Sequence, residues 1–218
     1  MTPAELAARL RLIVVTDRHA AAPRSVVEVV QAALAAGAPA IQLRDKEASA
    51  RELLEGGRAL LPLAREAGAL FFVNDRVDVA LALGADGVHV GPADLPVGAL
   101  RSAVPHDFLI GTSTDDPESA VALEADGADY IGCGTVYPTA TKPDAGYVIG
   151  LEGLDRVARA VSAPVVGIGG ITPERASAVA RTAASGIAVV SAVMGAADVS
   201  RVVGALLEPW RGRSGSPR

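Results

Sequence analysis

The sequence is poor in the residues that build disulfide frameworks and zinc sites. Its 218 residues include one cysteine, Cys133, and three histidines. A single cysteine cannot form an internal disulfide, and no Cys/His cluster has the spacing of a zinc site. We therefore expect a protein of the reducing cytoplasm, stabilised by its core.

Clusters of positive charge and long apolar runs are also missing. The formal net charge is −5 and the lysines and arginines are scattered, so the sequence lacks the cationic face that binds nucleic-acid phosphates. The apolar runs span only about five to eight residues, too few to cross a bilayer, and the N-terminus has no basic leader followed by an apolar stretch. We expect small-molecule partners, no nucleic acid and no membrane.

No linker or low-complexity stretch interrupts residues 10–207. This predicts a single domain over residues 1–207, followed by a loose C-terminal tail over residues 208–218.

Eight short runs rich in Val, Ile and Leu recur along the chain. Each is almost continuously apolar, as expected for strands covered on both faces in a parallel sheet. The predicted strands cover residues 12–17, 40–45, 70–75, 87–91, 108–113, 130–136, 164–170 and 186–193.

Segments with helical spacing lie between these runs. Residues 25–37, 50–68 and 118–127 are clear examples, and each ends at a glycine suited to a helix C-terminus. Eight βα units in about two hundred residues indicate the α/β class and a single (β/α)8 TIM barrel. An open doubly wound sheet is the alternative, because periodicity does not establish closure.

Polar residues follow most of the predicted strands, and in a parallel barrel these strand ends share one rim. Asp75 closes the third strand and Asp94 follows the fourth. Two carboxylates from adjacent loops suit Mg²⁺, which takes few protein ligands when substrate phosphates complete its coordination shell. Alternatively, Asp94 caps a helix that begins near Pro96.

Gln42, Arg44 and Lys46 alternate along the end of the second predicted strand. Their side chains can therefore share one face directed into the barrel mouth. Two cations buried there require an anion, and a phosphate group supplies one. The alternative is a solvated lip in which these cations pair with Asp45 or Glu47.

A second anion site is indicated on the other side of the mouth. The polar loop 135–146 has the composition of a lid. The small residues of 167–171 and 189–193 resemble a backbone phosphate cradle. Two separate anion sites favour two phosphorylated substrates.

Taken together, VVTD (14–17), QLRDK (42–46), residues 74–95, residues 127–142, VGIGGI (166–171) and VVSAV (189–193) resemble the thiamine phosphate synthase family. The similarity spans residues 12–193 in the right order. It implies a transferase that joins 4-amino-2-methyl-5-hydroxymethylpyrimidine diphosphate to a thiazole phosphate and releases pyrophosphate, with Mg²⁺ as cofactor.

The resemblance also implies roles for individual residues. Asp75 and Asp94 would bind the metal, and Ser113, Lys142 and Arg44 would act in catalysis. The substrates would be bound by Gln42, Leu43, Arg44, Asp45, Lys46, Asn74, Ser113, Thr139, Ala140, Thr141, Lys142, Gly170, Val190 and Ser191.

His89, inside the strand-like GVHVG, is interpreted as structural. The sequence departs from the family's common pattern at Pro92, at Thr135, in the stretch TSTDD (112–116) and in the loop PDAGYVIGLEGL that follows Lys142. The alternatives are a thiazole tautomerase-like relative, another phosphate-binding barrel isomerase or epimerase, and a non-catalytic thiamine-phosphate binding protein on the same barrel. The pattern is compatible with a homo-oligomer and with either a plain or a carboxylated thiazole phosphate.

Overall fold

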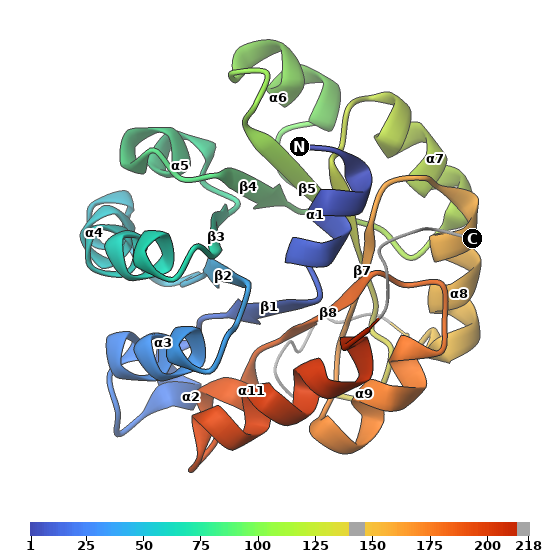
Figure 1. Cartoon of the computed structure of the whole chain (residues 1–218). Helices are drawn as coiled ribbons and strands as arrows, with labels where there is room; N and C mark the ends of the chain where they lie inside the picture. The colour runs from blue at the N-terminus through green and yellow to red at the C-terminus, as the bar shows by residue number, and fades with distance from the viewer. Residues whose placement is uncertain (140–146, 213–218) are drawn as a thin grey trace.

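The chain closes eight parallel strands into a barrel in the order β1 to β8, as a computed structural model shows (Figure 1). The structure describes residues 1–139 and 147–212. Closure comes from pairing of the first and last strands, in which Leu12 lies opposite Ile187. The single barrel is therefore confirmed, and the open sheet is excluded.

The strands are short and lie at the predicted places. They are β1 (Leu12–Val15), β2 (Ala40–Leu43), β3 (Leu70–Asn74), β4 (Gly87–Val90), β5 (Leu109–Ser113), β6 (Tyr130–Cys133), β7 (Val165–Ile168) and β8 (Gly186–Val189). Most end before the polar residues that follow them, so these residues lie in the loops at the rim.

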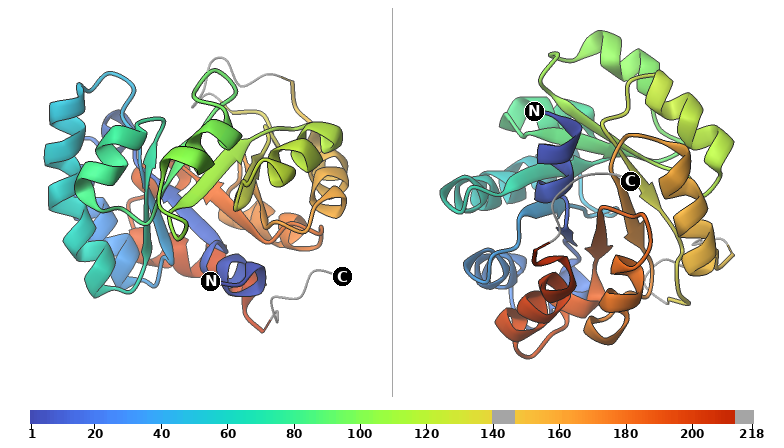
Figure 2. Two further views of the ribbon diagram at one scale, coloured as in Figure 1. Left: turned by 90° about the horizontal axis from the view of Figure 1, so that it is seen from above. Right: turned by 45° about the vertical axis from the view of Figure 1, so that its right-hand side comes forward.

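Helices surround the barrel (Figures 1 and 2). They are α1 (Pro3–Arg9), α2 (Arg18–Ala21), α3 (Val26–Ala35), α4 (Ala50–Glu66), α5 (Val77–Leu83), α6 (Val97–Ala103), α7 (Pro117–Ala125), α8 (Gly150–Ala160), α9 (Pro173–Ala180), α10 (Ser191–Met194) and α11 (Val199–Leu207), followed by the 3-10 helix η1 (Glu208–Trp210). The three glycines expected to end helices, Gly37, Gly68 and Gly127, all have positive φ.

The core has two layers. The larger layer lies between the strands and the outer helices. The smaller one fills the inside of the barrel and includes Leu6 and Leu10, from α1 and its C-terminus. Helix α1 therefore lies across one end of the barrel, as Figure 2 (left) shows, and packs Leu6 and Leu10 against inward-facing residues such as Ile13 and Phe72.

The predicted loose tail needs a correction. Residues 208–210 form η1, and the Trp210 side chain is only 2% exposed in the outer core. Burial of a large indole fixes this segment against α9 and α11. Residues 213–218 lie outside the described part of the chain.

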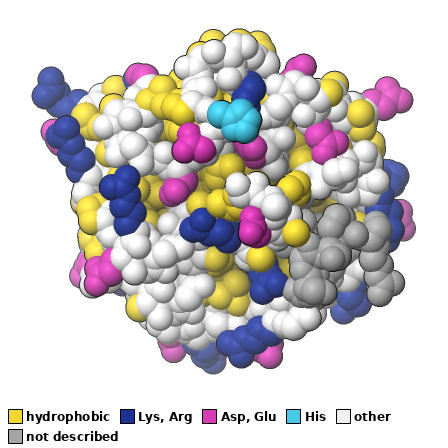
Figure 3. Space-filling view, turned by 45° about the horizontal axis from the view of Figure 1, so that its top comes forward, with side chains coloured by type: hydrophobic (Ala, Val, Ile, Leu, Met, Phe, Trp, Pro, Cys, Tyr) yellow, Lys and Arg dark blue, Asp and Glu magenta, His cyan; other side chains and the backbone are white. Residues whose placement is uncertain are grey.

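Charges of both signs are interspersed on the face seen in Figure 3. None of the helices within residues 1–139 and 147–212 is long and apolar enough to cross a membrane.

Candidate active site

A cavity of about 480 Å³ opens at the rim formed by the loops after the strands. The following residues line it: Ile13, Val15, Gln42, Arg44, Lys46, Asn74, Asp75, His89, Gly91, Ala93, Asp94, Ser113, Tyr130, Gly132, Gly134, Thr135, Thr139, Val166, Ile168, Gly169, Gly170, Ile171, Thr172, Ala188, Val189, Val190, Ser191 and Ala192. The predicted rim site is therefore a real concavity.

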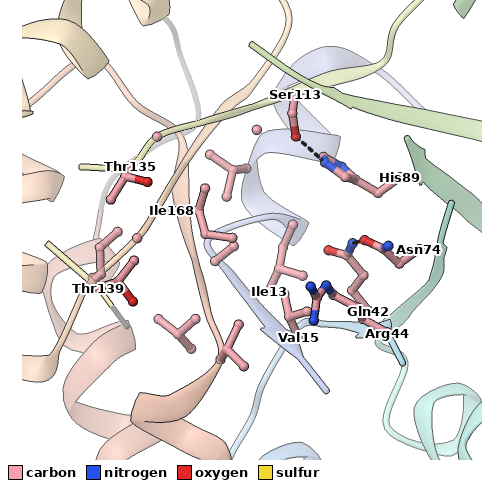
Figure 4. Close-up of a pocket in the computed structure, with 18 of the residues that line it drawn as sticks. Ile13, Val15, Gln42, Arg44, Asn74, His89, Ser113, Thr135, Thr139 and Ile168 are labelled. Carbon is pink, nitrogen blue, oxygen red and sulfur yellow. Dashed lines mark hydrogen bonds between the residues drawn. The ribbon is translucent and has the colours of Figure 1, made fainter. Parts of the chain in front are cut away.

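Polar and apolar side chains line opposite sides of the cavity floor. Gln42, Asn74, His89 and Ser113 come from the consecutive strands β2 to β5, whereas Ile13 and Ile168 come from β1 and β7 (Figure 4). The buried Gln42 donates a hydrogen bond from Nε2 to Asn74 Oδ1 at 2.8 Å. Its Oε1 atom points toward the cavity in Figure 4, where it can accept a hydrogen bond from a ligand.

The end of β2 provides the cations. Thr16 fixes the backbone of Arg44, because its Oγ1 accepts from Arg44 N at 2.8 Å and donates to Arg44 O at 3.0 Å. Arg44 and Lys46 both line the cavity. Asp45 and Glu47 pair with Arg18, at 3.2 and 2.6 Å. Arg18 therefore pairs with both acids, in contrast to the alternative of an internally paired lip. Arg44 and Lys46 instead lie near Asp75, where their positive charges act to lower its pKa.

Leu43 and Asp45, which the resemblance places in the substrate site, do not line the cavity. Side chains alternate along a strand, so these two face away from Gln42 and Arg44. Leu43 packs in the outer core, and Asp45 pairs with Arg18. Any contribution of either residue to ligand binding has to come through its backbone.

The two predicted metal ligands meet at the rim. Asp75 follows β3 with a left-handed φ of 62°, and its N–H donates to His89 O at 2.8 Å. Burial raises the pKa of Asp75 to about 6, and the charge of Asp94 and a hydrogen bond with it add to the effect. The carboxylates are therefore close enough to interact, which disfavours two uncompensated negative charges.

Asp94 does not cap the neighbouring helix. The N-cap of α6 is Pro96, and no side chain caps this helix. Instead, Asp94 Oδ2 accepts from Gly91 N at 2.7 Å, which holds the carboxylate beside the cavity. Among the residues that the structure describes, no group of three or more His, Cys, Asp or Glu side chains is arranged to hold a metal.

A row of polar side chains crosses the barrel floor beneath Ser113. His89 Nε2 lies 2.8 Å from Ser113 Oγ, and His89 Nδ1 lies 3.0 Å from the Tyr130 hydroxyl. Sequence patterns did not single out Tyr130, and they gave His89 only a structural part. The strand register reveals the row once the fold is known. Asn74 lies opposite His89, His89 opposite Gly111, and Gly111 opposite Tyr130.

The loops after β6, β7 and β8, where the sequence predicts a second anion site, form the other side of the cavity. Thr139, Gly170, Val190 and Ser191 line the cavity there, as predicted. Gly170 has a φ of +59°, and a Cβ atom at this position would lie 2.5 Å from Pro138 O. Only glycine allows this close approach of the two loops. Ala140, Thr141 and Lys142, together with most of the predicted lid, lie outside the described residues.

Arg175 of α9 ties these loops together, a role that the sequence did not reveal. Its guanidinium lies 4.7 Å from the centroid of the Tyr137 ring, and its Nη1 donates to Gly170 O at 2.6 Å. The cation–π contact and the hydrogen bond hold the β6 and β7 loops in one arrangement.

Residues 12–193 match the family model described as thiamine monophosphate synthase. The chain belongs to this family. It is 49% identical to a thiamine-phosphate synthase of Moorella thermoacetica over 90% of this chain and 94% of the relative. The corresponding enzyme of Roseiflexus castenholzii is 51% identical over 89% and 86%.

A solved structure supports the same assignment. A thiamine phosphate pyrophosphorylase from Pyrococcus furiosus superposes with a TM-score of 0.85 at 49% identity and covers 93% of this chain and 96% of that one. This member of the thiamine monophosphate synthase family is thus an enzyme of the transferase class. The alternative of a non-catalytic binding protein is not supported.

Proposed function

We propose that this enzyme joins 4-amino-2-methyl-5-hydroxymethylpyrimidine diphosphate to a thiazole phosphate and releases pyrophosphate. The observation that supports the proposal is one cavity that has two cations at one end and glycine- and serine-containing loops at the other. Arg44 and Lys46 form one end and the loops around Gly170 and Ser191 form the other, with a ring-lining floor between them. Two phosphorylated heterocycles that react at their rings fit this arrangement.

The residues at the rim fit a magnesium ion. Asp75 and Asp94 share a site in which burial and mutual repulsion raise the pKa of Asp75, and a bound cation would relieve both effects. A pair of carboxylates with phosphate oxygens suits Mg²⁺ better than Zn²⁺. When bound, the ion would neutralise negative charge on the diphosphate.

The chain's own residues would bind and orient the reactants. Arg44 and Lys46 would neutralise charge that builds on the departing pyrophosphate. Gln42 and Ser113 would hydrogen-bond the aminopyrimidine, and Ile13 and Ile168 would exclude water from its other side.

A dissociative substitution follows from this arrangement. The bond between the methylene carbon and the diphosphate oxygen breaks first, and the electron-rich aminopyrimidine supports the cation that remains. The thiazole nitrogen then attacks the methylene carbon from a fixed position. No protein nucleophile is needed. Cys133, the single cysteine, is buried in the outer core, and burial raises the pKa of its thiol to about 12.

Pyrophosphate release is the direct test. The purified enzyme should release pyrophosphate only when both substrates and Mg²⁺ are present. Asp75→Ala and Asp94→Ala should lower turnover by at least about a hundredfold without unfolding the protein, whereas the nearby surface variant Asp78→Ala should keep wild-type turnover. Absence of pyrophosphate under all conditions contradicts the proposed reaction, and wild-type rates in the first two variants contradict the metal site.

A further inference from the structure

Three side chains from neighbouring strands form a continuous hydrogen-bonded row beneath the cavity. The row runs from Tyr130 on β6 through His89 on β4 to Ser113 on β5, with distances of 3.0 and 2.8 Å. Figure 4 shows the last of these bonds, with Ser113 and His89 at the edge of the cavity. Tyr130 is 1% exposed, whereas Ser113 and His89 are partly exposed and therefore more accessible to a ligand.

Two glycines make room for the rings of this row. A Cβ atom on Gly111 would lie 2.1 Å from Tyr130 Cζ, and one on Gly132 would lie 3.0 Å from His89 Cε1. Contacts as short as the first do not occur, so β5 can carry only glycine where the phenol ring lies. The strands therefore accommodate the row specifically.

The direction of the hydrogen bonds follows from counting hydrogens. Burial raises the pKa of Tyr130, so its phenol keeps its hydrogen. Among the described residues the hydroxyl has one hydrogen-bond partner, His89 Nδ1, and an unused buried O–H group costs free energy. Tyr130 therefore donates to Nδ1.

The rest of the row is then fixed. A neutral imidazole that accepts at Nδ1 carries its hydrogen on Nε2, which donates to Ser113 Oγ. The Ser113 hydroxyl hydrogen remains available and can point into the cavity. The opposite direction would leave the phenol hydrogen without an acceptor among residues 1–139 and 147–212.

We propose that Tyr130 and His89 are positioning residues that hold the Ser113 hydroxyl as a hydrogen-bond donor to a ring nitrogen of the bound heterocycle. The inference rests on the proposed function for the identity of that heterocycle. It assigns His89 a part in ordering the substrate ring, beyond filling space in the barrel.

The tautomer of His89 can be measured without any substrate. The chain has three histidines, so ¹⁵N-histidine labelling gives few signals, and His89→Gln identifies the one that belongs to His89. At neutral pH we expect His89 to carry hydrogen on Nε2 only, and Tyr130→Phe should change its Nδ1 signal. A hydrogen on Nδ1 in the wild type, or an unchanged signal in Tyr130→Phe, would overturn the inference even if the proposed reaction is correct.

A double-mutant cycle tests the link to Ser113. Tyr130→Phe should lower kcat by about tenfold, the loss expected for one hydrogen bond, but should have no further effect in a Ser113→Ala background. The matched control is Phe72→Leu, because Phe72 packs edge-on against Tyr130 at 5.3 Å without joining the row. Its effect should be the same in both backgrounds. Equal effects of Tyr130→Phe in both backgrounds would contradict the role.

The conservative variant separates positioning from packing. His89→Gln keeps an N–H group that can donate to Ser113 and should retain more kcat than His89→Leu, which is similar in size but apolar. Equal activity of the two variants would contradict the inference. If the wild type releases no pyrophosphate, the proposed function fails, while the tautomer measurement still tests the row.

Discussion

Replacing Asp75 by Asn should stabilise the metal-free protein at neutral pH. Burial, followed by the charge of Asp94, raises the pKa of Asp75 from 3.8 to about 6 in the folded state. The folded state therefore holds the proton more tightly than the unfolded state does. The contribution of this group to stability is fully present below about pH 4 and is lost as the pH rises through 6.

The expected gain in stability from Asp75→Asn follows from the raised pKa of Asp75 and from its partial exposure to solvent. A pKa change of this size corresponds to about 3 kcal/mol for a group shielded from solvent. Asp75 is only half-buried, and solvent screening reduces the expected gain for Asp75→Asn at pH 7.5 to ~1 kcal/mol. Asn has nearly the same shape as Asp and tolerates the φ of 62° at this position. The variant should therefore change the charge without adding backbone strain.

Urea unfolding at pH 4.5 and 7.5 in the presence of EDTA measures this effect. The advantage of Asp75→Asn over the wild type should be small at pH 4.5 and larger at pH 7.5. Mg²⁺ should then raise the stability of the wild type at pH 7.5 and have less effect on the variant.

The control is Asp78→Asn. A hydrogen bond from Arg76 lowers the pKa of Asp78 in the wild type, so the charged carboxylate stabilises the fold. The Asp78→Asn variant should therefore be less stable than the wild type at pH 7.5. If Asp75→Asn is no more stable than the wild type at pH 7.5, our explanation of this carboxylate pair is refuted.

Three further variants test the remaining parts of the structure. Gly170→Ala introduces a Cβ atom 2.5 Å from Pro138 O at a φ of +59°, and should raise KM for the thiazole phosphate by at least about tenfold in steady-state kinetics. Arg175→Ala removes the contacts to Tyr137 and Gly170 and should raise the same KM about fivefold, with little change for the pyrimidine diphosphate and none in the surface control Arg181→Ala. Trp210→Ala should cost about 3–5 kcal/mol in urea unfolding, and a cost below about 1 kcal/mol would contradict the packing of η1.

The fold was predictable because its signals are local. Continuous apolar runs mark strands covered on both faces, and glycines such as Gly37 and Gly68 end helices at positive φ. Closure was less accessible, because it depends on the pairing of Leu12 with Ile187, which lie at opposite ends of the chain. The ordered η1 was missed for the same reason, since burial of Trp210 depends on helices distant in the fold.

The sequence predicted those site residues that are polar or charged and lie at or just after the ends of strands. Gln42, Arg44, Asp75 and Asp94 all line the cavity. Tyr130 was missed because an aromatic residue in an apolar run is indistinguishable by pattern from a core residue. Its importance depends on the space left by Gly111 on the neighbouring strand, which becomes visible only when the register is known.

Helix α1 also determines the side of the barrel from which ligands can enter. Because Leu6 and Leu10 fill the far end of the barrel, ligands must enter and leave through the rim. In the reaction that we propose, the ring held by Ser113 would lie on the cavity floor and would have to arrive before the second reactant covers it. We expect ordered binding, with the pyrimidine diphosphate first, and a product that must clear the rim before the next cycle begins.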